Sequence, residues 1–289
     1  MAVELHVVDQ GHGNPVVLLH GFPELAYSWR HQIEALLGAG YRVLAPDMRG
    51  YGRSPAPDEV AAYDILELCD DVAHLLDERG MERAAIVGHD WGATVAWHFA
   101  LLHPERVPCV AGISVPLVPN PPAAPLTIMR EHFGEDFYIV WFQEPGVAEA
   151  ALARDTRRTL LTPAVWNPEW AAREDENPRV PKFMTEDDVA VYLGEFERTG
   201  FRGGLNWYRN IDRNWELTRQ YDDRTVEMPA LFMAGTRDST IKWMPPDVMK
   251  GRVTDLRVEL IEGAGHWLQQ ERPDEVNAAL LALLRDAGW

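Results

Sequence analysis

The sequence contains little cysteine and comparatively few positive charges. Its 289 residues include two cysteines, Cys69 in a helical apolar pattern and Cys109 in an extended one. We therefore expect two buried free thiols rather than a disulfide or a zinc site. Lysine and arginine number 27 against 45 aspartates and glutamates, which gives a formal net charge of −18. Because the acidic residues are spread along the chain, this charge argues against nucleic acid or an anionic membrane surface as a partner.

Long hydrophobic runs are also missing, as are repeats and low-complexity segments. No apolar stretch is long enough to span a bilayer, and the first residues lack the basic start and apolar core of a signal peptide. The sequence thus predicts a soluble, cytoplasmic protein without membrane insertion. We expect a monomer or a homodimer. With 46% hydrophobic residues, it can form one large core, or a core with an inserted subdomain.

Apolar patterns typical of strands and helices alternate in the first and last parts of the chain. The expected strands cover residues 5–8, 15–19, 41–45, 84–87, 107–115, 230–234 and 256–261. We expect helices at residues 26–37, between Asp64 and Gly80, directly after Asp90, and from Pro273 onward. This alternation predicts a parallel sheet covered by helices on both faces, with function at the carboxyl ends of the strands.

The alternation stops at a cluster of prolines, and about a hundred residues without it follow. We expect an inserted helical cap at residues 118–223, between core segments 1–117 and 224–289. Its predicted helices cover residues 146–161, 186–198 and 204–218, the second of them capped by Thr185 and ended by Gly200. The cap is rich in tryptophan: Trp141, Trp166, Trp170, Trp207 and Trp215. These rings build the core of a small subdomain, or form an apolar lid over a pocket, and both interpretations can hold together.

One pentapeptide is typical of a nucleophile elbow, with aspartate where many hydrolases have serine: Gly88-His89-Asp90-Trp91-Gly92. An apolar strand pattern precedes it and a helical pattern follows. The motif is therefore expected at a strand-to-helix turn, which is where a nucleophile elbow occurs. The glycines leave room for a sharp turn. A carboxylate held there can attack an electrophilic carbon and become an ester. The alternative is that Asp90 merely caps the following helix.

Two more polar residues follow the last two expected strands, Asp238 and His266. Alone, Asp238 is explained as a turn residue and His266 as a structural histidine. Together with Asp90 they give the order nucleophile, acid, histidine, which is the order of the α/β-hydrolase fold. We therefore predict that fold, a mostly parallel central sheet flanked by helices with an inserted helical cap.

A turn after the second expected strand completes this set: His20-Gly21-Phe22-Pro23. The backbone N–H groups of Phe22 and Trp91 are expected to form an oxyanion hole, and we expect a cis bond before Pro23. The segment of residues 47–54 is interpreted as loop scaffolding in which Arg49 anchors backbone. Three further histidines, His89, His98 and His103, lack partners for a metal site and are interpreted as packing or hydrogen-bonding residues.

Five motifs together resemble the soluble epoxide hydrolases over nearly the whole chain. They are His20-Gly21-Phe22-Pro23-Glu24, the elbow pentapeptide, the segments of residues 142–149 and 200–210, and Gly265-His266-Trp267. The resemblance implies that two cap tyrosines hold the epoxide oxygen, and Tyr138 and Tyr208 match them. Trp141 stands where relatives often have another tyrosine. Family members also usually have an earlier first strand, so we expect seven strands or a very short first one.

The resemblance implies hydrolysis of an apolar epoxide to a vicinal diol. Asp90 forms an alkyl ester, and His266, oriented by Asp238, activates the water that hydrolyses it. We expect Trp141, Trp207 and Trp267 to line the substrate pocket, and neither a metal nor an organic cofactor to be needed.

Two alternatives stay open from the sequence. A dehalogenase of the same fold also uses an aspartate nucleophile, but haloalkane dehalogenases typically have asparagine where Phe22 stands. A non-catalytic ligand-binding homologue is the other alternative, and the complete set of Asp90, Asp238 and His266 argues against it.

Overall fold

A seven-stranded sheet forms the centre of the protein in a computed structural model that describes residues 2–162, 166–173 and 178–289. Its strand order is β1-β3-β2-β4-β5-β6-β7, and β1 alone runs antiparallel to its neighbour. The strands are β1 (Val7–Gln10), β2 (Pro15–Leu19), β3 (Arg42–Pro46), β4 (Ala85–His89), β5 (Val110–Ile113), β6 (Ala230–Gly235) and β7 (Leu256–Ile261). All seven expected strands are present, and the predicted mostly parallel sheet is confirmed.

Strand β2 shows why the sheet has two buried faces. Successive side chains of a strand point to opposite faces. Val17 and Leu19 accordingly pack in one hydrophobic cluster, and Val16 and Leu18 pack in another. All four are fully buried, which explains the continuous apolar run of this strand.

Helices cover both faces of the sheet. Helices α2 (Ile65–Glu78) and α3 (Trp91–Leu102) contribute to the first cluster, and α1 (Arg30–Gly38) and α14 (Pro273–Asp286) to the second. The predicted start of α2 is confirmed, since the Asp64 carboxylate accepts hydrogen bonds from two N–H groups of its first turn. Gly80, with φ of 64°, follows its end. The predicted helix 26–37 is divided into a 3₁₀ turn, η1 (Ala26–Trp29), and α1.

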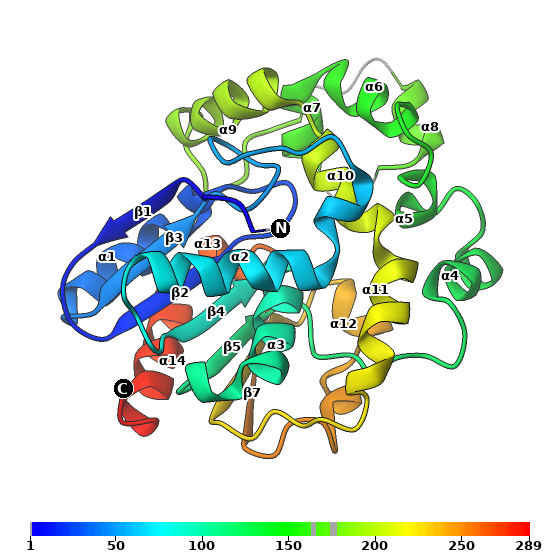
Figure 1. Cartoon of the computed structure of the whole chain (residues 1–289). Coiled ribbons are helices and arrows are strands. Elements are labelled where there is room, and N and C mark those ends of the chain that lie inside the picture. The colour runs from blue at the N-terminus through cyan, green and yellow to red at the C-terminus, as the bar shows by residue number, and fades with distance from the viewer. Residues whose placement is uncertain (1, 163–165, 174–177) are drawn as a thin grey trace.

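The segment between β5 and β6 is helical, as predicted. Figure 1 shows its helices, in green and yellow, gathered beyond the sheet. They are α4 (Pro125–Phe133), α5 (Tyr138–Trp141), α6 (Val147–Ala153), α7 (Thr156–Leu161), α8 (Pro168–Ala172), α9 (Glu186–Thr199), α10 (Arg202–Arg209) and α11 (Ile211–Thr218). The segment packs over the carboxyl end of β2, where the ring of Phe22 contacts those of Phe201 and Tyr208.

Two of the predicted helices in this segment are each divided in two. The expected helix 146–161 ends before Asp155, whose carboxylate caps α7 by accepting a 2.9 Å hydrogen bond from Arg158 N–H. The expected helix 204–218 is interrupted at Asn210, whose side-chain amide donates to the Val60 carbonyl at 2.6 Å. The third prediction was confirmed, because Thr185 caps α9 and Gly200, with φ of 66°, ends it.

The remaining α-helices are short: α12 (Thr240–Trp243) and α13 (Leu268–Glu271). In the part of the chain that the structure describes, no helix combines the length and the apolar character needed to cross a membrane. Both cysteines are buried and free, as expected.

Candidate active site

Asp90 stands at the turn between β4 and α3, with φ of 54° and ψ of −120°. A β-carbon on Gly88 would collide with the Gly92 carbonyl, and one on Gly92 would collide with the Leu19 carbonyl. Both glycines are therefore required by the tight approach of the elbow to its surroundings. The Asp90 side chain makes no capping hydrogen bond to α3, so the helix-cap alternative was wrong.

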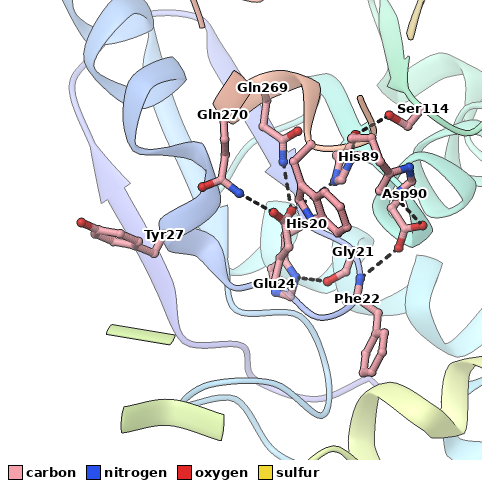
Figure 2. A network of polar contacts seen from close by, with 12 residues as sticks. His20, Gly21, Phe22, Glu24, Tyr27, His89, Asp90, Ser114, Gln269 and Gln270 are labelled. Carbon is pink, nitrogen blue, oxygen red and sulfur yellow. Dashed lines mark hydrogen bonds and ion pairs between the residues drawn. The ribbon is translucent and has the colours of Figure 1, made fainter. Parts of the chain in front are cut away.

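The two carboxylate oxygens of Asp90 have different partners. Oδ1 accepts a 2.9 Å hydrogen bond from the backbone N–H of Phe22, as Figure 2 shows. Oδ2 lies 3.5 Å from Nε2 of His266. Burial alone would raise the pKa of Asp90, but the nearby His266 and the Phe22 N–H lower it below its ordinary value. Asp90 is thus held as an anion, the form that can attack carbon.

The predicted oxyanion turn has the expected backbone. The bond between Phe22 and Pro23 is cis. Trp91 is the first residue of α3, where backbone N–H groups have no partner within the helix. His20 supports the turn, because its Nε2 accepts a 2.9 Å hydrogen bond from Met48 N–H.

Asp238 and His266 form a hydrogen-bonded pair, with 2.9 Å between Oδ2 and Nδ1. Asp238 is 1% exposed, and its other oxygen accepts a 2.8 Å bond from Thr240 N–H. Burial alone would raise the pKa of Asp238, but His266 and the Thr240 N–H lower it to about 2. Burial alone would lower the pKa of His266, but Asp238 and Asp90 raise it well above its ordinary value. The structure thus brings the three predicted residues together.

Two phenol rings come from the inserted segment. Tyr138 is the first residue of α5 and Tyr208 lies in α10, with 6.0 Å between their ring centroids. The Tyr208 ring also packs edge-on against Trp91 at 5.2 Å. Burial, and then the negative charge of Asp90, raise the pKa of both phenols above their ordinary value of 10. Both tyrosines therefore stay protonated at neutral pH and can donate a hydrogen bond.

The three tryptophans expected to line the pocket have different surroundings. The Trp267 ring lies edge-on to His266 at 5.0 Å. Trp207 is fully buried, and its Nε1–H donates to the Arg49 carbonyl at 3.1 Å. Trp141 is half-buried beside Phe142, with 5.6 Å between ring centroids. Trp166 and Trp170 are buried as well, which supports the interpretation of these rings as subdomain core.

Arg49 anchors the loop of residues 47–54 as predicted. Its guanidinium donates to the Ala62 carbonyl and pairs with Asp71 at 2.7 and 2.6 Å. Both side chains of this ion pair are almost fully buried, at 1% and 0% exposed. The pair holds the loop against α2.

Sequence reasoning missed the role of Glu24, which is 2% exposed. Figure 2 shows its carboxylate accepting hydrogen bonds from Gln269 at 2.9 Å and Gln270 at 2.6 Å. It also lies 3.1 Å from Nδ1 of His89, whose Nε2 lies 2.8 Å from the His266 carbonyl oxygen. His89 is thus a hydrogen-bonding histidine, as expected. The sequence signals for Glu24 were its place next to the oxyanion turn and within the motif His20-Gly21-Phe22-Pro23-Glu24.

No group of three or more histidine, cysteine, aspartate or glutamate side chains with the geometry of a metal site occurs in residues 2–162, 166–173 and 178–289. The anionic groups at the site instead pair with His266 and with backbone N–H groups.

Comparison with known proteins places this arrangement in a family. A sequence model of the alpha/beta hydrolase fold matches residues 14–273. The chain is 49% identical to epoxide hydrolase A of Mycobacterium tuberculosis, over 98% of this chain and 94% of that protein. It is 39% identical to the rat bifunctional epoxide hydrolase 2, of which it spans about half, 54%.

Solved structures agree with the sequence relatives. Epoxide hydrolase A from Mycobacterium thermoresistibile superposes with a TM-score of 0.90 at 49% identity, covering 98% of this chain and 95% of that one. An epoxide hydrolase from Vigna radiata gives a TM-score of 0.91 at 35% identity, with coverage of 98% and 95%. With the family match and these full-length relatives, the chain belongs to the α/β-hydrolase fold, and within it to the epoxide hydrolases.

Proposed function

We propose that this enzyme hydrolyses an apolar epoxide to a vicinal diol through a covalent ester on Asp90. The observation that carries the proposal is the division of the Asp90 carboxylate between two partners. Oδ1 is held by the Phe22 N–H, and Oδ2 is left facing His266. One oxygen is thus bound by an oxyanion donor, while the other remains available to attack carbon.

The first step opens the epoxide ring. An electron pair of Asp90 Oδ2 forms the new bond to carbon, and the carbon–oxygen bond of the ring breaks with its electrons moving to oxygen. Tyr138 and Tyr208 hydrogen-bond this oxygen, and one of them gives it a proton. Because both phenols are protonated and lie in the inserted segment, they supply the acid that an oxygen leaving group requires.

The second step hydrolyses the ester. His266, oriented by Asp238, takes a proton from water, and the hydroxide attacks the Asp90 carboxyl carbon. The N–H groups of Phe22 and Trp91 stabilise the tetrahedral oxyanion. When the intermediate collapses, the departing alkoxide takes the proton from His266. The second proton of the water is then on the Asp90 carboxylic acid. It passes to the phenolate left by the first step, which restores both the Asp90 carboxylate and the phenol.

Residues 118–223 act in this proposal as a cap over a core built from residues 1–117 and 224–289. Support comes from the two phenols, which the inserted segment contributes to a site whose other groups follow the strands. The apolar rings of Trp141, Trp207 and Trp267 favour an apolar substrate. Asparagine at the position of Phe22 would have favoured a halide, and the relatives named above are epoxide hydrolases.

Trapping of the ester tests the proposal. A His266→Gln variant incubated with a styrene-type epoxide should gain the mass of one substrate molecule, because its ester cannot be hydrolysed. His98→Gln is the matched control, since Nδ1 of His98 lies 2.8 Å from the Thr94 carbonyl oxygen of its own helix, and this variant should turn over normally. Halide release from haloalkanes without any epoxide adduct would support a dehalogenase instead. Binding of epoxides without adduct or turnover would support the non-catalytic alternative.

A further inference from the structure

Ser114 has an unusual backbone conformation next to the site. Among the described residues, two non-glycine residues have a positive φ, Asp90 at 54° and Ser114 at 70°. The elbow accounts for Asp90, but the proposed mechanism makes no use of Ser114. Such conformations are disfavoured for residues with a β-carbon and persist where the surroundings fix them, which is common at functional sites.

The surroundings of Ser114 fix it from several directions. It follows β5 directly and is fully buried. Its N–H donates to the Met233 carbonyl on β6 at 2.8 Å, and the Trp97 indole donates to the next carbonyl, that of Val115, at 3.0 Å. On the other side, the Asp90 N–H donates to the Ile113 carbonyl at 3.1 Å. Ser114 therefore stands between the strand that leads to the nucleophile and the strand that leads to Asp238.

The hydroxyl of Ser114 contacts the turn that carries His266. Its Oγ donates a 2.7 Å hydrogen bond to the backbone carbonyl of His266, and His89 Nε2 approaches the same carbonyl oxygen at 2.8 Å. Ser114 and His89 lie close to Asp90 in Figure 2. The carbonyl of His266 thus has two buried side-chain partners, Ser114 and His89.

We propose that Ser114 is a positioning residue for the hydrolytic step, acting through the His266 carbonyl; this inference rests on the proposed function. Asp238 fixes the Nδ1 edge of the imidazole at 2.9 Å, and Thr240 Oγ1 lies 3.5 Å from the same nitrogen. With the carbonyl also held, Nε2 is directed at the Asp90 side chain, where the water must be deprotonated. Ring opening does not need this proton transfer, so it should not depend on Ser114.

Formation of the Asp90 ester and its hydrolysis are measured separately, with stopped-flow fluorescence and a styrene-type epoxide. Ser114→Ala removes the hydroxyl and keeps a β-carbon at positive φ, whereas Ser114→Gly removes both. In each variant hydrolysis of the ester should slow by about 10- to 100-fold, since small misplacements of a catalytic group have effects of that order. The rate of ester formation should be unchanged.

Ser28→Ala is the matched control. Ser28 is also fully buried, and within the described residues its hydroxyl has no hydrogen-bond partner. This variant should keep both rates. Urea unfolding of each variant shows whether it is folded, and Ser114→Cys, which keeps a weak donor, should fall between wild type and Ser114→Ala.

Two results would overturn the inference. They are hydrolysis at the wild-type rate in Ser114→Ala or Ser114→Gly, and an equal slowing of ester formation and ester hydrolysis. A wild-type rate in Ser114→Gly alone would make backbone strain the cause, not the hydroxyl. Failure of the proposed function itself looks different, because His266→Gln would then form no ester at all.

Discussion

The backbone N–H of Phe22 donates a 2.9 Å hydrogen bond to Oδ1 of Asp90. In the proposed mechanism this oxygen becomes the carbonyl oxygen of the ester and then carries the negative charge of the tetrahedral intermediate. The donor that stabilises the charge is therefore in contact with the right atom before any substrate binds. Such preorganisation needs no rearrangement during the reaction.

The pH profile of ester hydrolysis should show a lower pKa than His266 has in the free enzyme. Asp238 and Asp90 raise the pKa of His266 against the effect of burial. Ester formation neutralises Asp90, so the pKa of His266 falls in the intermediate. The neutral imidazole is the base in the proposed mechanism, and hydrolysis should therefore speed up with rising pH until that lower pKa is passed. Stopped-flow pH profiles give the pKa of ester hydrolysis, and an NMR titration gives the pKa of His266 in the free enzyme. A hydrolytic pKa equal to or above that of the free enzyme would refute this prediction.

Replacement of Asp238 by asparagine should slow ester hydrolysis by about 10²- to 10⁴-fold. The variant loses the charge that stabilises protonated His266, and its amide N–H group can donate to Nδ1 and hold the wrong tautomer. Ester formation should be affected little, so the intermediate should accumulate and be visible by intact mass. Asp247→Asn is the control, because Asp247 is exposed and pairs with Lys250 on the surface. Turnover without accumulation in Asp238→Asn would show that His266 acts without its partner.

Removal of either phenol should slow ring opening and leave hydrolysis unchanged. We expect Tyr138→Phe and Tyr208→Phe each to reduce the rate of ester formation by about 10- to 100-fold, since one phenol remains. Tyr192→Phe is a matched control, because Tyr192 is a buried tyrosine of the same segment whose ring packs against Tyr27. If Tyr138→Phe opens the ring as fast as wild type, Tyr138 is only a packing residue.

The wild-type enzyme should also keep its rate of ring opening at alkaline pH. Burial and the charge of Asp90 raise the pKa of both phenols above 10, and a phenol stays protonated below its pKa. The rate of ester formation should therefore be flat up to about pH 10. A decline that begins near pH 8 would mean that a different group supplies the proton.

The buried ion pair of Arg49 and Asp71 should dominate the stability of the loop of residues 47–54. Asp71→Ala leaves the guanidinium buried without this carboxylate, and we expect a loss of about 3–5 kcal/mol in the free energy of unfolding. Urea denaturation measures it. The double variant Arg49→Met, Asp71→Leu should lose less, because no charge is then left buried. Equal losses in the single and double variants would contradict this explanation.

Most of the sheet and the order of the site residues could be predicted because their signals are local. An apolar run such as residues 16–19 directly indicates a buried strand. Glycines on both sides of Asp90 directly indicate a tight turn. The interruption of a helix at Asn210 could not be predicted, since its partner, Val60, is 150 residues away in sequence. For the same reason no sequence pattern marked Ser114, whose partner lies 152 residues away.

The identity of the two phenols came from the family resemblance and not from any periodicity. Tyr138 and Tyr208 lie on different helices of the inserted segment, and only the packing of those helices brings their rings to 6.0 Å. The sequence around each shows an aromatic residue in a helical pattern, which is also typical of a core residue.

A single turnover in heavy-oxygen water, with enzyme in excess over epoxide, tests the covalent route most directly. Water attacks the carboxyl carbon of Asp90 in this account, so the heavy oxygen should enter the Asp90 side chain, and the diol from that first turnover should carry none. Peptide mass spectrometry after digestion locates the label. Unlabelled Asp90 together with a labelled diol would show that water attacks the epoxide directly, and would contradict the ester intermediate.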